Sequence, residues 1–188
     1  DLWDNAHDGG TLTTPTVTDG VVYTSNREGN VFCLDAMTGT VVWARDLQSE
    51  MGLEPPTWGF SASPLIVYDR VILNVDRVVA LDRETGATAW ATERQYGIAY
   101  ATPAAFEHDG RDCLASLSGD GLVVLDRADG RELAFFEWVK NPQIYPATPV
   151  VIGDRIFISA GYDRGCAMLR FTGDALELWQ AMRIASSV

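Results

Sequence analysis

The stretch LDAMTGTVVW at residues 34–43 decides the fold, because it returns as LDRETGATAW at residues 81–90. A weaker copy, LDRADGRELA, occupies residues 125–134, and a fourth, at residues 169–173, keeps only the leucine and the Thr-Gly pair. Similarity at a regular spacing indicates repeated structural units that bury their faces against one another. The chain is therefore predicted to be a repeat protein.

A second signal precedes each copy of the motif: a small residue followed by a proline. These prolines are Pro15, Pro64, Pro103 and Pro149. Their spacing of about 40–50 residues is typical of the blades of a propeller. The predicted units cover, approximately, residues 13–50, 58–95, 98–140 and 143–183.

Each unit reads as four short strands joined by tight turns. In the first unit we expect strands over residues 13–17, 21–25, 31–35 and 40–45. The pair Asp19-Gly20 between the first two strands is a strong hairpin signal. Related turn pairs recur at Asp69-Arg70, Asp109-Gly110 and Gly153-Asp154. No segment shows an apolar period of 3.6 residues over the length of a helix. The sequence thus predicts an all-β protein, a β-propeller of four-stranded antiparallel blades with about four blades present.

The repeated motif has a structural explanation. Its aspartates are placed to accept backbone N–H bonds within a turn, and its glycines supply the positive φ that the turn requires. These residues are Asp35, Asp82, Asp126, Gly39, Gly86 and Gly130, and the segments 35–39, 82–86 and 126–130 are called the motif turns below. Trp43 and Trp90 follow their glycines by four residues, where a large aromatic can pack on the neighbouring blade. In the third copy Ala134 replaces the tryptophan, and Phe135 and Phe136 are expected to compensate. The motif therefore predicts a tryptophan-docking contact between blades and no catalytic role.

Composition narrows the class of protein. The chain has 188 residues, of which 47% are apolar and 21% charged, as in an ordinary globular protein. A net charge of −12 argues against binding to nucleic acid or to an anionic membrane surface. No apolar run reaches the roughly 18–20 residues needed to cross a bilayer, so no membrane insertion is expected. The cysteines Cys33, Cys113 and Cys166 are odd in number and far apart, which favours buried apolar positions over a disulfide framework or a zinc site.

The small-Pro pairs and the pattern Gly-x-Val-x-x-Leu-Asp-x-x-Thr-Gly-x-x-x-Trp together resemble the pyrroloquinoline-quinone-type (PQQ-like) repeat. The resemblance is clearest over Asn30–Trp43 and Asp76–Trp90 and extends from about Thr13 to Arg183. It implies a propeller of seven or eight blades, of which this chain would be a fragment; a closed four-bladed ring is the alternative. Known members include bacterial quinoprotein dehydrogenases, which hold the quinone and a calcium ion at the propeller axis. They also include the outer-membrane β-barrel assembly lipoprotein family, which is a protein-binding scaffold.

The loops on the side opposite the motif turns differ most between units, and binding residues concentrate in such loops. Aromatic residues gather there, just before the first strand of each unit. They are Trp58, Phe60, Tyr96, Tyr100 and Tyr145. These side chains could ring a central channel and grip a peptide, a sugar or a flat cofactor. Alternatively, they could simply fill the funnel, and the sequence leaves both possibilities open.

We therefore expect a non-catalytic scaffold that binds a protein or peptide partner through its loop face, outside the cytoplasm, together with the remaining blades of a parent propeller. The alternatives are part of a PQQ-dependent dehydrogenase and a carbohydrate-binding propeller. Adjacent cysteines, expected beside the quinone, are absent, and no acidic pair lies in register with an asparagine to hold calcium. His7 and His108 both precede an Asp-Gly turn. No catalytic residue, no metal ligand and no cofactor is therefore predicted, and PQQ and calcium belong to the alternative alone.

Overall fold

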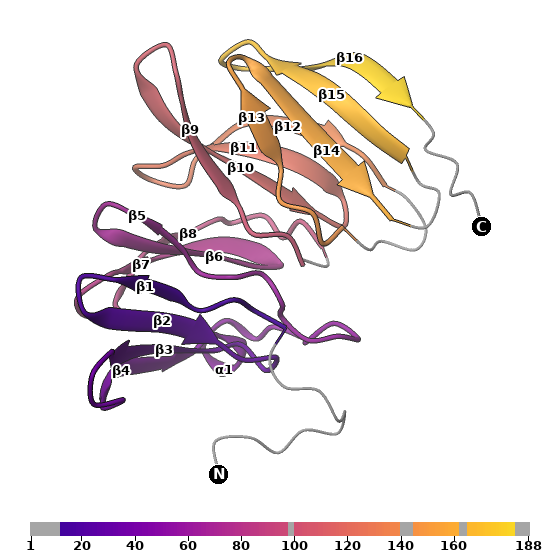
Figure 1. The fold of residues 1–188 in the computed structure, drawn as a ribbon. Coiled ribbons are helices and arrows are strands. Elements are labelled where there is room, and N and C mark those ends of the chain that lie inside the picture. Colours follow the sequence, from indigo (N-terminus) through magenta and orange to yellow (C-terminus); the bar gives the residue numbers. More distant parts are fainter. Residues whose placement is uncertain (1–11, 98–99, 140–144, 162–164, 183–188) are drawn as a thin grey trace.

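The computed structural model describes residues 12–97, 100–139, 145–161 and 165–182. Over these residues the chain forms four separate sheets of four antiparallel strands each, and the strands of each sheet follow one another in chain order. We call the sheets blades 1 to 4. Figure 1 shows them side by side, with blade 1 in indigo and blade 4 in yellow-orange. The predicted all-β class with four-stranded antiparallel blades is confirmed.

The strands have the following bounds. Blade 1 contains β1 (Thr16–Thr18), β2 (Val21–Ser25), β3 (Asn30–Asp35) and β4 (Val41–Asp46). Blade 2 contains β5 (Leu65–Val67), β6 (Arg70–Val75), β7 (Arg77–Asp82) and β8 (Thr88–Ala91). Blade 3 contains β9 (Ala104–His108), β10 (Arg111–Ser118), β11 (Gly121–Asp126) and β12 (Glu132–Glu137). Blade 4 contains β13 (Val150–Ile152), β14 (Arg155–Ala160), β15 (Gly165–Phe171) and β16 (Leu176–Met182).

Three local expectations were wrong. The first strand of blade 1, expected over residues 13–17, covers Thr16–Thr18 instead. A short helix, α1 (Leu47–Met51), follows β4, where no helix was predicted. Asp46 caps its first turn by accepting a hydrogen bond from the Ser49 backbone, and five residues are too few to produce a visible helical period. The second hairpin also turns one residue earlier than expected, because Arg70 already belongs to β6 and Tyr68 adopts the positive φ.

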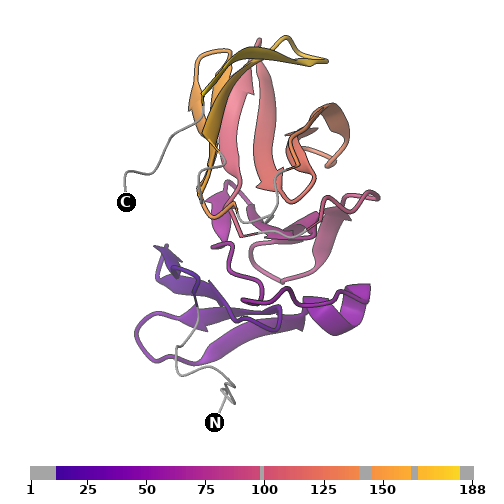
Figure 2. The same ribbon diagram turned by 90° about the vertical axis from the view of Figure 1, so that its right-hand side faces the viewer.

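The blades pack face to face because their strands alternate. In β6, Val71 and Leu73 point toward blade 1 and belong to one core, while Ile72 points toward blade 3 and belongs to another. A third core lies between blades 3 and 4 and includes Leu122 and Phe171. Blades 2 and 3 are thus covered on both faces, and Figure 2 shows the same order of sheets from the side. We call these three contacts joint 1–2, joint 2–3 and joint 3–4.

Candidate functional site

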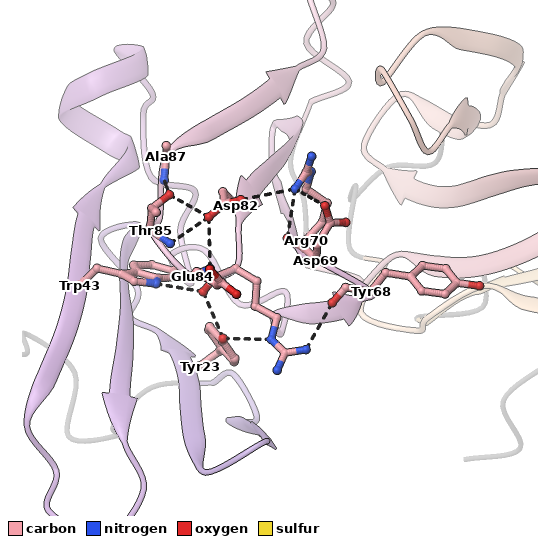
Figure 3. Close-up of polar contacts among 10 residues, drawn as sticks. Tyr23, Trp43, Tyr68, Asp69, Arg70, Asp82, Glu84, Thr85 and Ala87 are labelled. Carbon is pink, nitrogen blue, oxygen red and sulfur yellow. Dashed lines mark hydrogen bonds and ion pairs between the residues drawn. The ribbon is translucent and has the colours of Figure 1, made fainter.

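The motif turns are held by their aspartates. The Asp82 carboxylate accepts hydrogen bonds from the backbone of Glu84 at 3.2 Å and of Thr85 at 2.9 Å, and from the Thr85 hydroxyl at 2.8 Å (Figure 3). Asp35 makes the matching set of bonds to Met37 and Thr38. The threonine hydroxyl lowers the pKa of the carboxyl group at both turns. These carboxylates are therefore ionised turn residues, each with one oxygen, Oδ1, engaged in holding its turn.

The third motif turn keeps part of this arrangement. Asp126 accepts from the backbone of Ala128 at 2.9 Å. Asp129 stands where the other copies have threonine, and it accepts from the backbone of Arg131 at 3.0 Å. The Asp129 carboxylate thus accepts the backbone hydrogen bond that the threonine hydroxyl accepts in the other two motif turns.

Each motif tryptophan reaches the motif turn of the next blade. The indole N–H of Trp43 donates to the backbone carbonyl of Arg83 at 3.1 Å, and that of Trp90 donates to the carbonyl of Arg127 at 3.1 Å. The ring then lies on the turn glycine: a Cβ on Gly86 would stand 2.8 Å from the ring of Trp43. Only glycine permits an approach this close.

Joint 3–4 has no motif tryptophan, because Ala134 occupies that position and is buried. Phe171 fills the joint instead, with its ring centroid 4.8 Å from that of His108 and 5.9 Å from that of Phe106. Phe136 packs against the same core, whereas Phe135 points the other way and stacks on Tyr96 of joint 2–3. Of the two phenylalanines expected to compensate for the missing tryptophan, only Phe136 lies at this joint.

A cavity of about 660 Å³ opens at joint 1–2, beside the motif turn of blade 2. Arg83 crosses it: its guanidinium binds Asp19 and donates to the Tyr23 hydroxyl and to the Tyr68 carbonyl, as Figure 3 shows in part. Burial raises the pKa of Tyr23 and of the Cys33 thiol, so both stay neutral at pH 7. The guanidinium therefore makes polar contacts with three oxygen atoms. These contacts join blade 1 to blade 2 across the cavity, which indicates a structural role for its lining.

The predicted aromatic ring lies mostly inside the protein. Phe60, Tyr96, Tyr100 and Tyr145 are buried. The hydroxyl of Tyr96 donates to Glu132 at 2.7 Å, and the hydroxyl of Tyr145 to the Trp138 carbonyl at 3.1 Å; burial also raises the pKa of Tyr96. Of the five predicted residues, Trp58 has a large exposed area, 43% of its surface, and its ring meets the edge of Tyr100 at a centroid distance of 5.9 Å.

The loop that carries Trp58 is fixed by contacts with a loop of blade 1. Arg27 accepts from the Phe60 backbone at 2.9 Å and donates to the Thr57 carbonyl at 3.3 Å. Gly59 lies so close that a Cβ there would meet the Arg27 carbonyl at 2.6 Å. Arg27 was not predicted as a site residue; the only sequence signal is the glycine beside Trp58.

A second set of contacts ties the loops of blades 2 and 3. The Asp76 carboxylate accepts from the Gly97 backbone at 2.8 Å. The backbone of Asp120 donates to the Tyr96 carbonyl at 2.9 Å and accepts from Trp138 at 3.0 Å. The loops opposite the motif turns are thus tied together in two groups, residues 26–30 with 52–60 and residue 76 with 93–97 and 118–121. We call these residues together the loop platform.

Among the described residues, no three His, Cys, Asp or Glu side chains converge to hold a metal ion. His7 lies outside the described residues. In the same part of the chain, no helix is both long and apolar enough to cross a membrane.

Three comparisons place this architecture among known proteins. The family described as Outer membrane protein assembly factor BamB matches residues 1–188. The protein of that name from Moranella endobia is 27% identical over 160 residues, which is 84% of this chain and 37% of that protein. The crystal structure of BamB from Moraxella catarrhalis aligns with a TM-score of 0.70 and 22% identity, over 92% of this chain and 51% of that one.

Quinohemoprotein alcohol dehydrogenase from Comamonas testosteroni aligns with a TM-score of 0.66 and 17% identity, over 93% of this chain and 35% of that one. At this identity the likeness shows a shared fold alone. The chain spans less than two fifths of the curated relative and about half of the solved one. The resemblance to the PQQ-like repeat propeller predicted from the motif is confirmed.

Proposed function

We propose, on the premise that this chain belongs to the family described as Outer membrane protein assembly factor BamB, that it is a non-catalytic scaffold that binds a protein partner through its loop platform. The proposal assigns it no catalytic residue and no cofactor. What supports a binding role is a rigid surface with one exposed indole, since interfaces are enriched in aromatic anchors on preorganised backbone.

Trp58 carries the proposal. Trp58 is 43% exposed, yet its ring makes an edge contact with the ring of Tyr100, and Arg27 fixes the residues on both sides of it. A side chain ordered in this way loses little conformational entropy when a partner covers it. The neighbouring positions Glu54, Pro55 and Thr57 are exposed as well, so a partner segment could lie along this loop.

The family supports a proposal for the location and the partner. The relatives are named for assembly of outer membrane proteins, and we propose that this chain likewise works outside the cytoplasm, with a partner that takes part in such assembly. Because the chain spans only part of these relatives, we propose that the rest of the propeller contributes to the binding surface.

The test uses photocrosslinking. A photoreactive phenylalanine analogue replaces Trp58 in the full chain, and in a matched control it replaces Tyr68, which is exposed in the β5–β6 turn on the side of the motif turns. After exposure to a periplasmic extract, we expect protein adducts from position 58 and not from position 68. In a further variant the photoreactive residue stands at a third exposed site and Trp58 is replaced by alanine. Trp58→Ala should lower the yield of the same complex by about tenfold or more, with an unchanged thermal unfolding midpoint.

Adducts at position 68 alone would contradict the placement on the loop platform. The non-catalytic part is tested separately, by adding PQQ and calcium to the full chain with alcohols and a redox dye. Dye reduction above that of the quinone and calcium without protein would contradict it.

A further inference from the structure

The triplet His-Asp-Gly at residues 108–110 is used neither by the repeat motif nor by the loop platform. It lies where β9 turns into β10, and Asp109 has a positive φ there. An aspartate followed by glycine is prone to a rearrangement of the main chain, because glycine has no side chain to hinder attack by its own backbone nitrogen on the preceding carboxyl group. The surroundings of each Asp-Gly pair decide whether it can react.

Asp-Gly occurs five times in the sequence, and four of these pairs lie in the described residues. Two of the four are locked by the fold. The Gly130 nitrogen donates to the Asp126 carbonyl at 2.9 Å, and Gly130 lies under the ring of Trp90. Gly121 belongs to β11, and a Cβ on it would stand 2.1 Å from the Phe136 carbonyl oxygen. In neither pair is the peptide group free to turn toward the carboxylate.

The other two pairs form hairpin turns of the same shape. Asp19 and Asp109 both have a φ of 49°, and Gly20 and Gly110 have φ values of 78° and 76°. Such positive angles are typical of the two-residue hairpin turns that Asp-Gly favours. A Cβ on either glycine would meet nothing within 4 Å. The backbone thus has nearly the same conformation in both pairs, so a difference in reactivity must come from side-chain contacts.

The Asp19 side chain is held in its ionised form. Its carboxylate pairs with the guanidinium of Arg83 and accepts a hydrogen bond from the Thr18 hydroxyl at 3.2 Å. The hydrogen bond from Arg83 lowers the pKa of Asp19, because it stabilises the charged form of the carboxyl group. An ionised carboxylate loses an oxygen as water far less readily than a protonated carboxyl group does. These contacts therefore protect the bond between Asp19 and Gly20.

The Asp109 side chain lacks such contacts in the described part of the chain. It is 93% exposed, and its one basic neighbour within 4 Å is the His108 imidazole, at 3.6 Å. That distance is too long for a hydrogen bond. A cavity of about 300 Å³ borders the turn at joint 3–4; it is lined by His108, Asp109, Arg111, Phe171 and Gly173. Water therefore reaches this turn, and the turn has room to change shape.

We propose that the bond between Asp109 and Gly110 is a modification site, at which the folded chain rearranges to isoaspartate. The Gly110 nitrogen attacks Cγ of Asp109. A new N–C bond forms while a carboxyl C–O bond breaks, and one water leaves with the amide proton and the carboxyl proton. Water then adds to the cyclic imide and opens it at the main-chain carbonyl of Asp109. The main chain now runs through Cβ and Cγ of this residue, and no oxidant or reductant is consumed.

The product changes the chain beside joint 3–4. His108 directly precedes the modified residue, and its ring centroid lies 4.8 Å from that of Phe171. Joint 3–4 lacks a motif tryptophan, so this aromatic contact is part of what holds it together. We expect the rearranged chain to unfold at a lower temperature. The turn lies on the side of the motif turns, so the proposal goes beyond the proposed function and does not depend on it.

The experiment incubates the purified 188-residue chain at neutral pH and body temperature and measures isoaspartate at each pair by peptide mapping with electron-transfer fragmentation. We expect isoaspartate at residue 109 to accumulate severalfold faster than at residue 19. Synthetic peptides covering residues 105–113 and 15–23 should rearrange at similar rates, because they lack the contacts of the fold. Equal rates at the two positions of the folded chain would overturn the proposal. So would the absence of isoaspartate at residue 109 over a period in which the peptide 105–113 forms it.

Matched variants test the chemistry and its consequence. Asp109→Gly tolerates the positive φ and has no carboxyl group, so its unfolding temperature should stay constant during the incubation while that of the wild type falls. Asp109→Asn should rearrange severalfold faster, because ammonia leaves an amide more readily than water leaves a carboxylate. An equal fall in the unfolding temperature of Asp109→Gly would contradict the effect on joint 3–4.

Arg83→Gln tests the protection of the other turn. It removes the charge that pairs with Asp19 and should raise the rate at residue 19 severalfold, with no change at residue 109. A rise at both positions would show that the substitution loosens the whole fold, and no rise at residue 19 would show that Arg83 does not protect it. Either result would contradict the assignment of the difference to side-chain contacts.

Discussion

Joint 1–2 and joint 3–4 join the same kind of sheet in different ways. In joint 1–2 the indole of Trp43 donates to the Arg83 carbonyl and lies on Gly86. In joint 3–4 the indole position is Ala134, and Phe171 fills the space with Phe106 and His108. A directional hydrogen bond and non-directional aromatic packing thus support equivalent positions, so the motif can decay in one blade without loss of the fold.

The largest expected effect tests whether the two joints are equally strong. Trp43→Ala should lower the free energy of unfolding by about 3–5 kcal/mol, the cost of deleting a buried aromatic ring. Phe171→Ala should lower the free energy of unfolding by a similar amount, because Phe171 fills the equivalent space in joint 3–4. Urea unfolding followed by circular dichroism measures both. A much smaller cost for Phe171→Ala would show that joint 3–4 does not depend on its aromatic packing.

The next effect separates crowding from backbone strain at the motif glycines. Gly130→Ala should cost about 2–5 kcal/mol, because the new Cβ would stand 2.3 Å from the Trp90 ring and the backbone has a positive φ. Gly39→Ala should cost about 1–2 kcal/mol, since only the φ term applies there. Both are measured by thermal unfolding. Equal costs would mean that indole contact adds nothing at joint 2–3.

A smaller effect isolates the indole hydrogen bond. Trp90→Phe should lower the free energy of unfolding by about 1 kcal/mol beyond its lost area, because the Arg127 carbonyl loses its indole donor. Trp43→Phe should cost less, since the Arg83 carbonyl also accepts from the Tyr23 hydroxyl at 3.1 Å. Urea midpoints of the two variants check the order, and the reverse order would show that the Tyr23 bond does not substitute for the indole.

The smallest effect concerns pH. The Thr85 hydroxyl bond lowers the pKa of Asp82 in the folded chain below its ordinary value. A lowered folded-state pKa contributes stability that is present above the unfolded-state pKa and is lost as pH falls through the folded-state value. The difference in unfolding midpoint between the wild type and Asp82→Asn should therefore be present at neutral pH and vanish in acid. A difference that grows below pH 4 would contradict the sign.

Local sequence patterns predicted most of the fold. The second strand of blade 1, Val21–Ser25, has the predicted bounds, because alternation and turn residues act over a few positions. The helix α1 escaped prediction because it consists of a single capped turn. The tryptophan lost at Ala134 was visible in the sequence, but the side chains that replace it, Phe106 and Phe171, come from strands more than sixty residues apart.

The candidate site was less predictable, because burial of loop residues depends on distant contacts. Trp58 and Phe60 are two residues apart in the same loop, yet one is exposed and the other buried. The difference in exposure is set by residues roughly thirty positions earlier. Arg27 bonds to this loop through its carbonyl, and Gly29 lies against the ring of Phe60. No pattern within the loop itself encodes that difference. The face that carries the aromatic residues could be predicted from topology. Which of these aromatic side chains reaches solvent could not.

The acceptor for each motif indole is a main-chain oxygen, and this has a consequence for how such a chain diversifies. The residue that supplies the oxygen can change identity without removing it: the position holds Ala36 in blade 1, Arg83 in blade 2 and Arg127 in blade 3. Its side chain is then free to acquire other tasks, as Arg127 does by pairing with Asp112 and covering the ring of Tyr68. Sequence drift at this site therefore keeps the hydrogen bond that the indole makes, and libraries that vary it should yield folded proteins.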